Sequence, residues 1–204
     1  MIIKGILVGH MEENCYLAVN EDTKEAVIID PGAQADYIKE KVLEEGAKPV
    51  AILLTHGHFD HTGAVKELRE YYGIKAYANE KEKEFLENLS MCLSKTQVKV
   101  DDYFSDMEVL LLAGFQIQAI WTPGHTPGGT CFYFVKEKVL FSGDSLFQES
   151  VGRSDLPGGS MGSLITSIKE KLFLLDDDVV VYPGHMDVTT IGHEKQYNFF
   201  IKMN

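Results

Sequence analysis

The stretch Ala51–His61, with the sequence AILLTHGHFDH, is the part of the chain that decides the predicted fold. Its first residues are apolar and end abruptly at Thr55, which is typical of a short buried strand. Four side chains that commonly bind metals follow within six residues: His56, His58, Asp60 and His61. Imidazole nitrogens with a carboxylate form the ligand set of zinc and similar metals. We therefore predict a metal site in the loop after this strand, with a helix beginning near Thr62.

Three later segments repeat this design, because each has a buried strand, a turn with glycine and then a potential ligand. These ligands are His125, Asp144 and His185. Glycine permits the unusual backbone angles and close approaches that converging side chains require. Seven potential ligands are too many for one tetrahedral ion, and they favour two metals that share a bridging carboxylate. His10 and His193 lack this context, so we leave them out of the predicted site.

The pattern of apolar residues predicts a layered α/β fold in one domain over residues 1–204. An antiparallel meander is expected first, over residues 2–8, 14–19 and 26–30, and two hairpins are expected over residues 107–121 and 131–142. The expected helices cover residues 35–45, 62–72, 81–88, 161–174 and 192–201. In the first of these helices, Ile38, Val42 and Leu43 are predicted to face the core. Residues 89–100 show no clear periodicity and are predicted to form a loop near the site.

Composition excludes some classes of function. The 204 residues include 19 basic and 31 acidic side chains, for a formal net charge of −12. Such a charge argues against a protein that tracks nucleic-acid phosphates. Three widely spaced cysteines without a CxxC pair indicate a reducing compartment, and Cys15 and Cys131 are expected to be buried thiols. We find no signal peptide and no membrane-spanning stretch, so we expect a cytoplasmic protein that contacts neither membrane nor nucleic acid.

Four motifs in the chain resemble those of the metallo-β-lactamase fold superfamily. They are THGHFDH, PGHTPG, SGDSLF and YPGH, and their order and intervals match over roughly residues 5–190. The resemblance implies a four-layered αββα sandwich of two mixed sheets with helices outside, and a site at one edge. It also implies two divalent metal ions, with zinc expected first and iron or manganese as alternatives. By this resemblance the first metal binds His56, His58 and His125, the second binds Asp60, His61 and His185, and Asp144 bridges them.

Within the superfamily, the sequence resembles the glyoxalase II-like (hydroxyacylglutathione hydrolase-like) enzymes, which cleave thioesters such as S-lactoylglutathione. This resemblance implies that a metal-bridging hydroxide attacks a thioester or small ester, with Asp60 orienting it. Arg153 matches a basic glutathione contact of that family, but Asp155 and Asp187 stand near the places of two tyrosines. Only 19 residues follow His185, where glyoxalase II continues with a helical domain. We therefore expect a small-molecule substrate and weak recognition of glutathione.

Other functions remain open from the sequence. Persulfide dioxygenases resemble this chain too, and they share a loop like Gly152–Asp155. Such an enzyme would hold one iron with His56, His125 and Asp144, a facial triad with open positions. A nuclease of the same fold is disfavoured by the acidic charge, and a non-catalytic metal-binding module by the full set of seven ligands.

Two further residues keep two interpretations each. Arg153 either pairs with Asp155 at the surface or binds a substrate carboxylate with both arms of its guanidinium group. Asp30 ends an apolar strand, so it either caps that strand locally or lies behind the metal loop.

Overall fold

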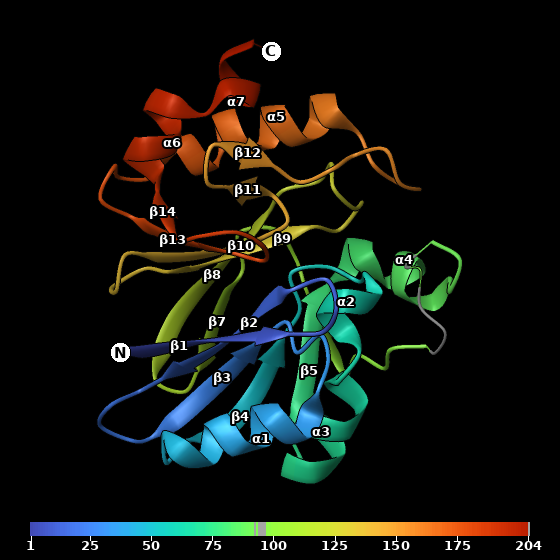
Figure 1. Cartoon of the computed structure of the whole chain (residues 1–204), viewed down its shortest axis with the longest axis vertical. Coiled ribbons are helices and arrows are strands. Elements are labelled where there is room, and N and C mark those ends of the chain that lie inside the picture. Colours follow the sequence, from blue (N-terminus) through green and yellow to red (C-terminus); the bar gives the residue numbers. More distant parts are fainter. Residues whose placement is uncertain (92, 94–96, 204) are drawn as a thin grey trace.

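Two six-stranded β-sheets face each other and carry helices on their outer faces, as Figure 1 shows. The computed structural model describes residues 1–91, 93 and 97–203. In Figure 1, helices α1 (Ala35–Glu44) and α3 (Val65–Tyr72) lie below the first sheet, and α5 (Met161–Glu170), α6 (Ile191–Tyr197) and α7 (Phe199–Met203) lie above the second. This confirms the predicted αββα sandwich of two mixed sheets.

The first sheet has the strand order β1-β2-β3-β4-β5-β6. The first three strands pair antiparallel, as the meander predicted, and β3 to β6 pair parallel. Its strands are β1 (Ile2–Val8), β2 (Glu13–Val19), β3 (Glu25–Ile29), β4 (Lys48–Leu53), β5 (Lys75–Asn79) and β6 (Asp102–Phe104). Helix α2 (Phe59–Thr62) follows β4, while the 3₁₀ turn η1 (Glu80–Glu82) and helix α4 (Lys83–Glu87) follow β5.

The second sheet has the order β14-β13-β10-β9-β8-β7. Its strands pair antiparallel except for β10 and β13, which pair parallel. They are β7 (Val109–Leu112), β8 (Phe115–Trp121), β9 (Thr130–Phe134), β10 (Val139–Gly143), β13 (Val180–Pro183) and β14 (Thr189–Thr190). A separate ribbon of β11 (Leu146–Phe147) and β12 (Ser150–Val151) follows β10, and the 3₁₀ turn η2 (Leu172–Leu174) follows α5.

Alternation along the strands builds three apolar layers. Along β2, Cys15 and Leu17 pack toward α1 and α3, whereas Tyr16 and Ala18 pack between the two sheets. The layer between the sheets contains many aromatic side chains, among them Phe115, Phe132, Phe134 and Phe141. Cys131 lies in the third layer, under α5. Cys15 and Cys131 are thus buried, as predicted, whereas Cys92 lies outside the described residues, as do positions 94–96 of the predicted loop.

The prediction that Leu43 faces the core is wrong. Leu43 is 81% exposed, whereas Ile38 and Val42 are buried against the first sheet. Successive residues of a helix are about 100° apart around its axis, so a residue next to Val42 turns away from the core. Throughout the described part of the chain, every helix is too short or too polar to cross a bilayer.

The helix predicted over residues 62–72 begins only at Val65, as α3, and the short helix α2 precedes it, with Gly63 and Ala64 between the two. A Cβ atom at Gly63 would lie 2.3 Å from the carbonyl oxygen of Gly32, so only glycine fits this turn. Asp60 and His61 therefore lie on the separate short helix α2, and the longer helix α3 follows it. The helix predicted over residues 192–201 is also divided, at Asn198, whose side chain donates to the carbonyl of Ser150.

Candidate metal centre

All seven predicted ligands meet where four segments leave the two sheets. His56 and His58 follow β4, and the turn α2 then presents Asp60 and His61. The other three ligands follow strands of the second sheet: His125 after β8, Asp144 after β10 and His185 after β13. The site is therefore assembled between the sheets, at the ends of their strands.

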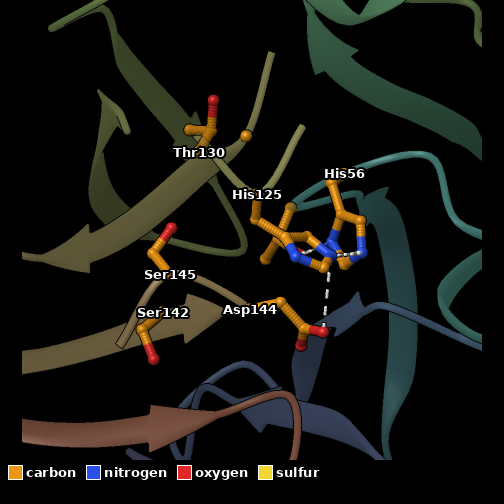
Figure 2. Close-up of a pocket in the computed structure, with 8 residues that line it drawn as sticks. His56, His125, Thr130, Ser142, Asp144 and Ser145 are labelled. Carbon is orange, nitrogen blue, oxygen red and sulfur yellow. Dashed lines mark hydrogen bonds and ion pairs between the residues drawn. The ribbon is translucent and has the colours of Figure 1, made fainter. Parts of the chain in front are cut away.

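The first cluster consists of His56, His58 and His125, whose ligand atoms lie within 4.8 Å of one another. His125 Nε2 lies 3.2 Å from His56 Nε2 and 2.9 Å from His58 Nδ1. Figure 2 shows the rings of His56 and His125 converging beside the carboxylate of Asp144, with Thr130, Ser142 and Ser145 to the left of them. All three histidines are almost completely buried.

Hydrogen bonds behind this cluster fix which nitrogens carry protons. His125 Nδ1 donates to the carbonyl of Arg153 at 2.7 Å, so its Nε2 is left with a lone pair. The Thr55 hydroxyl donates to Asp30 at 2.5 Å and accepts from His56 Nδ1 at 3.0 Å, so His56 Nε2 also has a lone pair. Two lone pairs 3.2 Å apart repel each other unless a cation lies between them. These residues therefore fit a metal ion.

Burial keeps these imidazoles neutral, as metal ligation requires. It lowers the pKa of His56 well below the usual value and also lowers that of His125. Burial and the neighbouring His125 lower the pKa of His58 to about 4. Near neutral pH, the lone pairs of this cluster are thus available to a cation.

The second cluster consists of Asp60, His61 and His185, again with ligand atoms within 4.8 Å of one another. His185 Nε2 lies 3.5 Å from Asp60 Oδ2. Burial raises the pKa of Asp60, but the hydrogen bond from His185 and the charge of His61 outweigh it and lower this pKa to about 2. Among the described side chains, His61 Nε2 is buried without a hydrogen-bond partner, which is expected of an atom oriented for a metal.

Asp144 lies between the two clusters. Its Oδ1 is 3.4 Å from His61 Nε2, and its Oδ2 is 3.5 Å from His125 Nε2 and 3.8 Å from His185 Nε2. Oδ1 is buried and makes no hydrogen bond to any described residue. A carboxylate in this position can contact an ion in either cluster.

Two buried acids lie behind His61. Asp30 accepts a hydrogen bond from His61 Nδ1 at 3.0 Å and another from the backbone of Thr55 at 2.7 Å. Of the two interpretations of Asp30, the structure therefore supports the acid behind the metal loop. The second acid is Glu13, which is completely buried, with Oε1 3.7 Å from His61 Nδ1. Glu13 was not predicted from the sequence. A charged residue at the start of an apolar strand was the available signal.

A cleft of about 360 Å³ opens onto the two clusters. Apart from the metal-ligand candidates, it is lined mainly by apolar side chains: Met11, Phe59, Leu93, Phe147 and Leu156. Arg153 also lines it, and its Nε and Nη2 atoms bind the two carboxylate oxygens of Asp155 at 2.8 and 2.9 Å. Arg153 is thus paired, as one interpretation predicted, and also lies where a substrate can reach it.

The sequence and the fold together place the chain in a family. The profile of the Metallo-beta-lactamase superfamily matches residues 8–185, most of the chain. The chain belongs to the metallo-beta-lactamase superfamily. The hydroxyacylglutathione hydrolase GloC of Haemophilus influenzae is a relative with 39% identity, and the match covers 98% of each protein. This confirms the predicted membership, and with it a metallo-hydrolase class and a metal site of histidine and aspartate.

Solved structures of this superfamily have the same fold. BLEG-1, a B3 metallo-beta-lactamase, is 40% identical in sequence to the present protein, with a TM-score of 0.91 over 98% of this chain and 99% of that one. TTHA1623 in a di-iron-bound form is 35% identical, with a TM-score of 0.85 over 97% of this chain and 99% of that one.

Proposed function

We propose that the protein is a dinuclear metal-dependent hydrolase that cleaves thioesters or related small esters. The position of Asp144 carries this proposal, because its two oxygens face ligands of both clusters at 3.4–3.8 Å. Two such ions would polarise a substrate carbonyl and lower the pKa of a water molecule. Zinc is the first expected metal, since the ligands are nitrogens and carboxylates.

The cleft favours a leaving group that departs without receiving a proton. Apart from the metal-ligand candidates, its described lining offers Arg153, which holds its protons permanently, and apolar side chains. An amine or alkoxide needs a proton to leave, whereas a thiol with an ordinary pKa near 8.5 leaves readily as a thiolate. The lining therefore supports a thioester as substrate. The name of the GloC relative, a hydroxyacylglutathione hydrolase, supports the same class of substrate.

Two residues have proposed roles beside metal binding. The carboxylate of Asp60 stays ionised because its pKa is about 2, so it accepts a hydrogen bond from an attacking water molecule and orients it. Arg153 lies at the cleft, and its Nη1 atom makes no hydrogen bond to any described residue, so it binds a carboxylate of the substrate.

A mononuclear iron enzyme acting on persulfides is the second candidate. The observation that favours it is the proximity of His56, His125 and Asp144, which make two histidines and a carboxylate around one point. The di-iron-bound form of TTHA1623 shows that a protein 35% identical to this one accepts iron.

Metal analysis followed by a substrate panel separates the two candidates. The protein is purified without chelators, its metals are counted, and the same sample is assayed with thioesters, a β-lactam and a persulfide. Two equivalents of metal, with thioester cleavage that continues in oxygen-free buffer, support the hydrolase. One equivalent of iron with oxygen uptake on the persulfide supports the second candidate and overturns the first.

A further inference from the structure

Glu82 is a buried carboxylate that lies next to both histidine loops and binds neither metal cluster. It ends the turn η1 after β5 and is 1% exposed. Its Oε1 accepts from the backbone N–H of Gly57 at 2.9 Å. Its Oε2 accepts from the backbone N–H of Gly128 at 2.6 Å and from the Thr126 hydroxyl at 3.1 Å.

The residues that Glu82 contacts flank the first cluster on both sides. Gly57 stands between His56 and His58, and Thr126 directly follows His125. His56 and His58 belong to the loop after β4 in one sheet, and His125 belongs to the loop after β8 in the other. One carboxylate therefore connects the two loops that must meet for three imidazoles to converge.

The chain is built closely around this carboxylate. A Cβ atom at Gly128 would lie 2.3 Å from the backbone nitrogen of Glu82, so only glycine allows this approach. Phe85 of α4, the helix that follows Glu82, contacts the ring of His58 with 5.4 Å between ring centroids. Asn79, just ahead of η1, donates to Thr130 at 3.1 Å and so adds a second contact at the start of β9, directly after the His125 loop.

Stability alone does not account for an ionisable group here. Burial raises the pKa of Glu82 to about 7 in spite of its three hydrogen bonds. An uncharged side chain would avoid that desolvation cost. A glutamine, however, has one acceptor oxygen and would turn its amide toward a backbone N–H, so it cannot hold both loops.

We propose that Glu82 is a positioning residue that holds the His56–His58 loop against the His125 loop, and thereby sets the metal affinity of the first cluster. It acts through backbone N–H groups and touches neither metal nor substrate. This inference rests on the proposed metal centre, but not on which substrate is cleaved. Partners behind metal ligands typically change metal affinity by about 10- to 100-fold.

The test compares Glu82→Gln with Glu194→Gln. Glu194 is a matched control, because it is also completely buried and accepts hydrogen bonds from the backbone of Glu149 and from the side chains of Thr189 and Asn198. It is not among the cleft-lining residues. Zinc affinity is measured by competition with a coloured chelator, and Co²⁺ spectra report the geometry of each bound ion.

Glu82→Gln should weaken the binding of one of two zinc ions at least tenfold and alter the Co²⁺ spectrum, while Glu194→Gln binds both ions as the wild type does. Saturating zinc should restore most of kcat to Glu82→Gln. If Glu82→Gln does not fold, Thr126→Val, which removes one of the three hydrogen bonds, should show a smaller loss in the same direction. Wild-type affinity in every folded variant at Glu82 or Thr126 overturns the inference. Wild-type protein that binds no second metal overturns the dinuclear proposal instead.

Discussion

Asp144 contacts both histidine clusters, so its loss should affect both proposed metals. In Asp144→Ala, we expect fewer than two equivalents of bound metal and activity reduced by more than about a hundredfold, since even partners behind a ligand cost that much. Asp187→Ala is the control, because Asp187 is exposed two residues after His185. Elemental analysis and steady-state assays on the same samples check both effects. A variant that retains two metals would contradict the bridging role.

Arg153 is either a surface partner of Asp155 or a contact for a substrate carboxylate. Arg153→Ala should raise KM for anionic thioesters more than it lowers kcat. This is the result expected when a contact is lost that binds the substrate and the transition state equally well. Asp155→Ala provides the opposite test, because it frees both paired nitrogens of the guanidinium group and should lower the same KM. Steady-state kinetics on charged and uncharged thioesters measure both variants. Unchanged KM values in both would leave the surface pairing as the whole role of Arg153.

Helix α1 offers a clean comparison between its two faces. Ile38 is fully buried in the layer under the first sheet, while Leu43 on the same helix is 81% exposed. Ile38→Ala should lower the free energy of unfolding by about 2–4 kcal/mol, because it leaves a cavity. Leu43→Ala should change it by less than about 0.5 kcal/mol. Urea denaturation of both variants gives these values, and a large loss in Leu43→Ala would indicate an unrecognised contact.

The metal centre joins the two halves of the molecule, since its ligands follow β4 in one sheet and β8, β10 and β13 in the other. Bound metals should therefore stabilise the whole fold. Ions present at a thousand times their Kd stabilise the folded state by about 4 kcal/mol, which corresponds to a Tm shift of roughly 10 °C for a chain of this size. Calorimetry with and without a chelator measures the shift. An unchanged Tm after proven metal removal would contradict this coupling.

The cleft between the two halves gives an expectation for glutathione thioesters. Its lining is mainly apolar, and its one cationic side chain in the described lining is paired with Asp155. Each missing hydrogen bond to a charged group costs about 1.5–3 kcal/mol, so two missing contacts lower kcat/KM by at least about a hundredfold. S-lactoylglutathione should therefore be cleaved no better than smaller thioesters. A strong preference for the glutathione ester in steady-state kinetics would contradict this expectation.

Short-range sequence patterns were sufficient for much of the fold. The boundaries of β1, β2, β8 and α1 follow from local periodicity and from turn residues, and the structure agrees within a residue or two. The short strands β6, β11, β12 and β14 were not predicted, since two or three residues give too little periodicity to recognise. The chain between α2 and α3 packs closely against Gly32, and Asn198 between α6 and α7 donates to Ser150; both partners are distant in sequence.

The sequence by itself determined the family and the seven candidate ligands, because each ligand stands in a local motif of strand, turn and polar side chain. Only the tertiary structure showed how these residues are supported. The positions of Asp30, Glu13 and Glu82 relative to the histidines depend on how separate strands pack. No local pattern distinguishes a glutamate on a charged turn, such as Glu82, from a solvated one. Its role appears only when two loops from different sheets donate their N–H groups to it.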